Sequence, residues 1–158
     1  MPSFTLTTTA AAPVEEVWKL LYDPARFPQW WAGVETVRHG EGGDYTMWPT
    51  GYPEFPMAQR MRSVRADARV TISCLVSDLE FRWQLTDQDG DTGIEVLVEL
   101  PDAEAHRLPV QRELLTASLA NLAAMAAAAA VPPGQSLSSS LSAEDRAAHR
   151  PGGSSRPA

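Results

Sequence analysis

Apolar and polar positions follow two different periods along this chain, and each change of period predicts a new element. Residues 3–10 alternate apolar and polar side chains, which is typical of a strand with one buried face. Residues 12–23 instead place Val14, Val17 and Leu21 on one stripe with helical spacing. The chain is therefore expected to begin with a strand that is followed by a short helix.

A second short helical segment is expected before the next strand. Asp23 and Pro24 end the first helix and can begin another, because Asp caps a helix and Pro is tolerated in its first turn. The segment 24–31 ends in two adjacent tryptophans, Trp30 and Trp31, where the chain turns from helix into strand. We expect one tryptophan to pack inward and the other onto the neighbouring loop. An aromatic platform for a protein partner is the alternative.

Strand-like runs separated by turn residues fill the middle of the chain. They cover residues 34–39, 44–48, 57–65, 69–76, 79–87 and 92–100. The segment 49–56 holds three prolines and a glycine and is expected to be a loop. Residues 101–130 are rich in strong helix formers, with Leu115, Leu119 and Leu122 on one apolar stripe. Six strands thus precede one long helix.

This order of elements predicts an α+β fold, in which a curved antiparallel sheet of about seven strands wraps around a long C-terminal helix. Two short helices follow the first strand. The space between a curved sheet and a single helix is where we expect a ligand pocket. Residues 1–131 are predicted to form this ligand-binding domain. Residues 132–158, rich in Ser, Pro, Gly and Arg, are predicted to be a disordered tail.

Three segments of the chain, residues 12–37, 92–100 and 114–126, together resemble the START-like, or SRPBCC, superfamily. The similarity is greatest to its bacterial polyketide cyclase/dehydrase and lipid-transport branch, and it spans residues 3–130. The resemblance implies a helix-grip fold with a hydrophobic cavity between the sheet and the long helix. Members include aromatic polyketide cyclases, lipid carriers, hormone receptors, quinone-binding proteins and chaperone activators, so the resemblance is specific for fold and much less so for function.

Alternation along each strand assigns an inner face, which the stripe of the long helix covers. The residues predicted to bind a ligand are Tyr45, Met57, Gln59, Met61, Ser63, Ile72, Cys74, Phe81, Trp83, Val96, Gln111, Leu115, Ser118 and Leu122. This surface collects amides, hydroxyls, one thiol and several methionines, but no carboxylate, histidine or arginine. Gln59 and Gln111 are the most informative pair, because an inward amide needs a partner. That partner is the other amide, water or a ligand carbonyl.

The loop between the third and fourth strands is expected to affect access to the cavity. In ligand-sensing relatives the corresponding loop gates the cavity, and the aromatic residues for such a lid here are Trp48, Tyr52 and Phe55. The alternative is a proline-stiffened loop whose aromatic side chains pack down onto the domain.

The resemblance to aromatic polyketide cyclases implies an inward-facing arginine that positions and polarises a poly-β-ketone chain. Ser63 occupies the matching position here, and alternation leaves Arg60 and Arg62 on the outer face. A register shift of one residue would bring an arginine inside. Catalysis by general acids and bases needs a group whose pKa can be brought near the working pH. Cyclase activity therefore stays open as an alternative.

Charge and composition limit the kinds of binding partner, cofactor and cellular location that are expected for this chain. A net charge of −7 opposes binding to nucleic acid or to anionic membranes, because phosphate binding depends on clustered Lys and Arg. No apolar run approaches the roughly 18 residues of a membrane span, so none is expected. One cysteine allows no internal disulfide and the amino terminus shows no secretory signal, which fits a cytoplasmic protein. His39, His106 and His149 lack companions at metal-ligand spacing, so neither a metal nor another cofactor is expected.

Noncovalent binding of a small hydrophobic molecule, lipid-like or polyketide-like, is the expected function, with the protein acting as carrier or sensor. The second hypothesis is a cyclase/dehydratase-type enzyme acting in the same cavity. It is favoured if an arginine of the fourth strand points inward, or if His106 and Tyr45 reach the cavity together. The third is a protein-interaction module, which an exposed aromatic patch of tryptophans beside a closed cavity would favour.

Overall fold

Seven antiparallel strands form one sheet in the computed structural model, which describes residues 1–131 of the chain. The strands are β1 (Ser3–Ala10), β2 (Val34–His39), β3 (Asp44–Pro49), β4 (Met57–Val64), β5 (Arg69–Cys74), β6 (Glu80–Gln88) and β7 (Asp91–Glu99). Their order across the sheet is β1-β7-β6-β5-β4-β3-β2, so the first strand of the chain pairs with the last. The predicted disordered tail, residues 132–158, lies outside the described residues.

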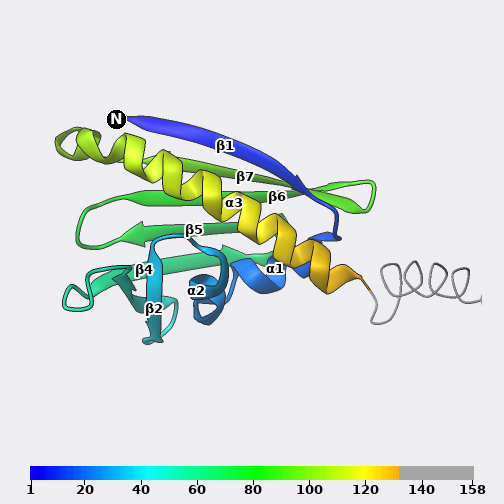
Figure 1. Ribbon diagram of the computed structural model, residues 1–158, viewed down its shortest axis with the longest axis horizontal. Coiled ribbons are helices and arrows are strands. Elements are labelled where there is room, and N and C mark those ends of the chain that lie inside the picture. Colours follow the sequence, from blue (N-terminus) through cyan, green and yellow to red (C-terminus); the bar gives the residue numbers. More distant parts are fainter. Residues whose placement is uncertain (132–158) are drawn as a thin grey trace, which may run out of the picture.

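Helices cover one face of this sheet. Those in the described part of the chain are α1 (Val14–Leu21), α2 (Phe27–Trp30) and α3 (Leu108–Ala130), together with the 3-10 turns η1 (Pro24–Arg26), η2 (Arg65–Asp67) and η3 (Asp102–Arg107). Figure 1 shows α3 crossing the sheet diagonally, and α1 and α2 both contact α3. The predicted α+β helix-grip fold, with two short helical segments after the first strand, is confirmed.

Strand register explains why one face of the sheet is buried. Trp83 on β6 pairs with Val70 on β5 and with Val96 on β7, and all three side chains are fully buried. From Leu115 onward, α3 presses a stripe of buried residues onto this face, including Leu122. Burial of each such leucine contributes roughly 1.5–3 kcal/mol to the stability of the folded domain. The core therefore lies under the middle and the carboxyl-terminal half of α3.

The adjacent tryptophans at the end of α2 are both buried, with 1% of Trp30 and 6% of Trp31 exposed. The backbone changes from helical to extended at Trp31 (φ −84°, ψ 105°), and the two rings stack with their centroids 5.3 Å apart. Trp30 Nε1 also donates a 3.0 Å hydrogen bond to the Leu20 carbonyl oxygen. The expectation that one ring packs onto the loop is therefore wrong. Neither ring supplies the exposed patch that a protein-interaction module would need.

Two element ends differ from the sequence prediction in a way that affects the cavity. β5 ends at Cys74 instead of residue 76, because the chain turns through Asp78 (φ 58°) and Cys74 N–H donates a 2.8 Å hydrogen bond to the Leu79 carbonyl oxygen. Val76, which alternation after Ile72 and Cys74 would place on the inner face of a longer strand, is consequently 63% exposed. Residues 102–107 form the 3-10 turn η3, so the regular helix starts at Leu108, seven residues later than the predicted start at residue 101. Ser77 of the turn after β5 and Arg107 of η3 line the same cavity, which is described below.

Within residues 1–131, the helical stretch Asp102–Ala130 is long and apolar enough to cross a membrane by length and composition alone. Core helices of globular domains have the same length and composition. Five residues of α3 are buried against the rest of the domain, and this packing accounts for the apolar composition of the helix.

Candidate functional site

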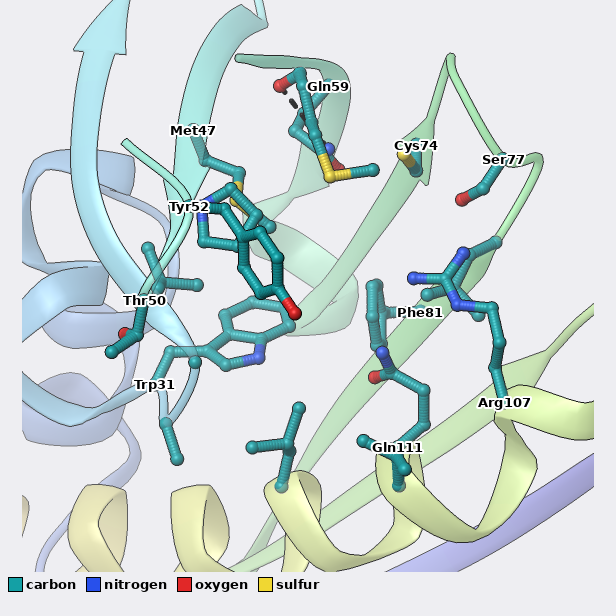
Figure 2. A pocket seen from close by; sticks show the side chains of 18 of the residues that line it. Trp31, Met47, Thr50, Tyr52, Gln59, Cys74, Ser77, Phe81, Arg107 and Gln111 are labelled. Atoms are coloured by element: carbon teal, nitrogen blue, oxygen red, sulfur yellow. Dashed lines mark hydrogen bonds between the residues drawn. The ribbon is translucent and has the colours of Figure 1, made fainter. Parts of the chain in front are cut away.

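An open cavity of about 570 Å³ lies between the first turns of α3 and the sheet. Its wall comes from the α2–β2 junction and the start of β2, from strands β3, β4, β5 and β6, from the β3–β4 loop and the β5–β6 turn, and from η3 and α3 (Figure 2). Farther along its length, α3 packs directly on the sheet, so the cavity is confined to the space beneath the first turns of the helix. Cavities of this volume hold ligands of the size of a small organic molecule.

Aromatic and thioether side chains form much of the cavity wall. Trp31 and Phe81 meet edge to face, with ring centroids 5.0 Å apart and an interplanar angle of 87°. In Figure 2, Tyr52 leans over Trp31 from the β3–β4 loop, and Met47 lies beside it. Such a wall offers a flat, polarizable surface to an aromatic or conjugated molecule.

Two buried polar side chains, Tyr45 and Gln59, interrupt the apolar wall. Burial raises the pKa of the Tyr45 phenol far above its ordinary value, and the neighbouring Cys74 thiol raises it further. The phenol therefore stays protonated and acts as a hydrogen-bond donor, not as a base. Gln59 is 3% exposed, and its Nε2 donates a long 3.4 Å hydrogen bond to the Met57 carbonyl oxygen.

Further polar groups gather on another side of the cavity, where η3 faces the β5–β6 turn. Arg107 lies there, and its Nη1 donates a 3.1 Å hydrogen bond to Glu104 Oε1. Ser77 Oγ is buried and has no hydrogen-bond partner among the described residues. Figure 2 shows the Arg107 guanidinium extending toward Ser77, and the Gln111 amide rising from α3 beside Phe81.

These residues overturn the expectation that the cavity wall holds no histidine or arginine, because His106 and Arg107 both line it. The expectation considered only strand faces and the stripe of one regular helix. The 3-10 turn η3 follows neither period, and it brings both side chains to the edge of the cavity.

The structure brings six of the predicted ligand-binding residues, and one predicted lid residue, to the cavity. They are Tyr45, Met57, Gln59, Cys74, Phe81, Gln111 and, from the loop, Tyr52. Gln59 and Gln111 stand on opposite walls in Figure 2 and do not contact each other. The amides therefore do not satisfy one another, which was one of the three expected solutions.

Six other predicted residues lie in the packed core and not in the cavity wall. They are Ile72, Trp83, Val96, Leu115, Ser118 and Leu122, each fully buried. Strand alternation and the apolar stripe of the helix had placed them correctly on facing surfaces, but α3 contacts the sheet there and leaves no space. Ser118 has a structural role instead, because its Oγ accepts a 2.8 Å hydrogen bond from Ala32 N–H.

Met61 and Ser63 line a separate surface depression of about 470 Å³, on the side of the domain that carries Tyr22 and Asp23. The position that the resemblance matches to a cyclase arginine therefore lies outside the main cavity. Arg60 and Arg62 are exposed, and Arg60 Nε pairs with Asp44 Oδ1 at 3.0 Å.

Two of the three predicted lid residues also lie outside the cavity wall. The Arg38 guanidinium stacks over the Trp48 ring at 5.3 Å, and Trp48 lines a shallow depression on the outer surface. Phe55 is 61% exposed and meets the Tyr52 ring at 6.0 Å. Tyr52 alone of the three reaches the cavity.

Thirteen wall residues lie outside the predicted ligand-binding and lid sets. They are Trp31, Ala32, Gly33, Val34, Met47, Pro49, Thr50, Ser77, Leu79, His106, Arg107, Val110 and Leu114. Many belong to turns and junctions, where no period assigns a face. Gly33 offered one usable signal: it has a positive φ of 94°, and a Cβ there would lie 3.2 Å from Leu114 Cδ1. A glycine at this junction marks the close approach of α3 to the chain after α2.

Among residues 1–131, no group of three or more His, Cys, Asp or Glu side chains is placed to hold a metal ion.

The fold and this cavity define a helix-grip domain with an internal, largely apolar site. The chain belongs to the SRPBCC-type family described as polyketide cyclase/dehydrase and lipid transport, whose model matches residues 1–127. The predicted superfamily is thereby confirmed. No curated protein matches the chain in sequence.

Solved structures agree with this fold. The Zhui aromatase/cyclase from Streptomyces sp. R1128 superposes with a TM-score of 0.67 at 18% identity, covering 79% of this chain and 93% of that one. The di-domain ARO/CYC BexL from the BE-7585A biosynthetic pathway gives a TM-score of 0.63 at 20% identity, covering 79% of this chain and 45% of that one. XoxI from Bacillus cereus gives 0.63 at 17% identity, covering 77% and 93%. At these identities the similarity establishes the fold alone.

Proposed function

We propose that this domain binds a small hydrophobic molecule noncovalently in the cavity beneath the start of α3, as a carrier or sensor. The observation that carries the proposal is the open cavity of about 570 Å³ with a mainly apolar wall that includes aromatic and thioether side chains. Membership of a family described by polyketide cyclases, dehydrases and lipid transport supports the same class of ligand.

The cavity is large enough to supply useful affinity. A ligand that removes about 300 Å² of apolar surface from water gains about 7.5 kcal/mol. Taken alone, this gain corresponds to a Kd of about 3 μM, and the lost freedom of the ligand and the ordering of loop side chains make the actual binding weaker than that. Tyr45 and Gln59 would orient the ligand, because each presents a buried polar group at the wall.

Native mass spectrometry of freshly purified protein tests the proposal, with a denatured extract analysed alongside. We expect a discrete bound mass that disappears in Met57→Trp, where the larger ring fills part of the cavity. Ala58→Trp is the matched control, because Ala58 is exposed on the opposite face of the same strand and the added ring leaves the cavity unchanged. A protein that stays free of ligand and takes up no member of a lipid and aromatic polyketide panel would contradict the proposal.

A cyclase/dehydratase-type enzyme is the second candidate, favoured by one specific observation. Tyr45 and His106 both line the cavity, so a hydrogen-bond donor and an imidazole face the same space. Against it, the arginines of β4 are exposed. Incubation with a poly-β-carbonyl thioester separates the two candidates. An enzyme releases water from the probe, and Tyr45→Phe stops this loss while the probe still binds. A carrier binds the probe unchanged.

A further inference from the structure

The cavity wall carries a strongly asymmetric charge. Within the described residues, no carboxylate lines it, and Arg107 supplies its only permanently charged side chain. The whole chain, by contrast, has a net charge of −7. A cation is therefore presented to the cavity by an otherwise acidic protein, which favours a negatively charged ligand at that point.

Arg107 has spare hydrogen-bonding capacity. Its guanidinium carries five N–H donors, of which the described part of the structure uses one, in the 3.1 Å bond to Glu104 Oε1. The Arg107 and Glu104 side chains are 29% and 31% exposed, so water screens this pair and it holds the guanidinium weakly. An incoming oxyanion competes with Glu104 for the Arg107 guanidinium, from which it can accept two parallel N–H hydrogen bonds.

Ser77 supplies a second donor at the same place. Its Oγ is buried and unpartnered among residues 1–131, which is an uncommon and costly state for a hydroxyl. Figure 2 shows the hydroxyl on the β5–β6 turn facing the Arg107 guanidinium, which extends from the end of η3. A group between these two elements would satisfy both side chains at once.

We propose that the ligand of this domain is an amphipathic anion with one oxyanion group of the carboxylate type. Arg107 and Ser77 bind the oxyanion at the edge of the cavity, and the apolar body lies against Trp31 and Phe81. This inference rests on the proposed function, since it assumes that the cavity binds a small hydrophobic molecule. It adds the charge of that molecule and its orientation.

Two fluorescent probes that differ by one anionic group test the inference. Anilinonaphthalene sulfonate and N-phenylnaphthylamine share the same aromatic body, and the first alone carries an oxyanion. We expect wild-type protein to bind the sulfonate more tightly. We expect Arg107→Gln to weaken sulfonate binding by about tenfold, the range of one charged hydrogen-bonded contact, and to leave the neutral probe within about twofold.

Two further variants sharpen the test. Arg62→Gln removes the same charge from the exposed face of β4 and should change neither affinity. Glu104→Gln should act in the opposite direction and tighten sulfonate binding, because it releases the Arg107 guanidinium and removes a negative charge close to the bound anion. Raising NaCl from about 20 to about 300 mM should weaken binding of the sulfonate but not of the neutral probe.

The outcomes separate this inference from the proposed function. If the neutral probe binds and Arg107→Gln weakens both probes equally, or neither, then the anion assignment is wrong while the cavity function stands. If Glu104→Gln weakens sulfonate binding, the assignment is also wrong. If neither probe binds wild-type protein, both proposals fail. Retained binding of the neutral probe shows that each variant is folded with its cavity intact.

Discussion

We expect that removal of one hydroxyl group, that of Ser118, lowers the stability of the domain and also loosens the cavity wall. Its side chain is fully buried on α3, where Oγ donates a 2.7 Å hydrogen bond to the Leu114 carbonyl oxygen and accepts a 2.8 Å bond from Ala32 N–H. Ala32 lies in the junction that follows Trp31 and lines the cavity. One hydroxyl thus ties the cavity wall to the long helix.

The expected cost of Ser118→Ala follows from these two bonds. The substitution leaves the half-buried Ala32 N–H without its acceptor, which costs about 1–3 kcal/mol. Alanine returns about 0.5 kcal/mol through its higher helix propensity. We therefore expect a net loss of about 1.5 kcal/mol in the free energy of unfolding. For a domain of this size, that loss lowers Tm by about 6 °C.

Thr116→Ala is the matched control on the same helix. Thr116 Oγ1 donates the same kind of bond, 2.7 Å to the Arg112 carbonyl oxygen, but it is exposed and reaches no other element. Urea unfolding followed by tryptophan fluorescence compares the two variants. We expect Thr116→Ala to stay within about 0.5 kcal/mol of wild type. Equal effects of the two substitutions would refute the reasoning, since the bond to Ala32 would then contribute nothing.

Two further predictions concern the cavity wall. Gly33→Ala should lower the free energy of unfolding by about 1–3 kcal/mol, because φ is +94° and the new Cβ would lie 3.2 Å from Leu114 Cδ1. Gly51→Ala is the control, because Gly51 has a similar φ of +86° but a Cβ there would have no neighbour within 4 Å, so this variant carries the backbone strain alone. If urea unfolding shows the same loss of stability for both variants, the contact with Leu114 costs nothing. Burial holds the Tyr45 phenol protonated, so its stabilisation is complete below the unfolded pKa of about 10 and is lost as pH rises above it. Tm measured against pH should therefore fall less steeply in Tyr45→Phe than in wild type, and identical slopes would contradict the assignment.

Strand faces could be predicted from the sequence because alternation reflects a local geometry. Alternation places Phe81 and Trp83 on the inner face of β6, and both are buried. Their contact with the cavity could not be predicted in the same way. Phe81 lines it, whereas Trp83 lies in the core. The difference depends on where α3 diverges from the sheet, which is a tertiary distance that no single strand encodes.

The polar residues at the edge of the cavity could not be predicted from the sequence either, because they lie on segments without a regular period. Residues 102–107 were expected to continue the long helix, and a regular helix fixes the direction of each side chain by its 3.6-residue period. The 3-10 turn η3 breaks that period and brings His106 and Arg107 to the cavity. Ser77 belongs to the turn between β5 and β6, where alternation assigns no face. Side chains on such segments are directed by contacts distant in sequence.

The central claim, that a ligand binds in this cavity, is tested most directly by methyl NMR. The chain has five methionines, of which Met47 and Met57 line the cavity. Met61 lines the separate depression, and Met125 lies near the other end of α3. In protein labelled with 13C at the methionine methyl groups, we expect N-phenylnaphthylamine to shift the Met47 and Met57 signals in a saturable manner and leave the other three in place. Shifts confined to Met61 or Met125, or no saturable shift at all, would contradict the account.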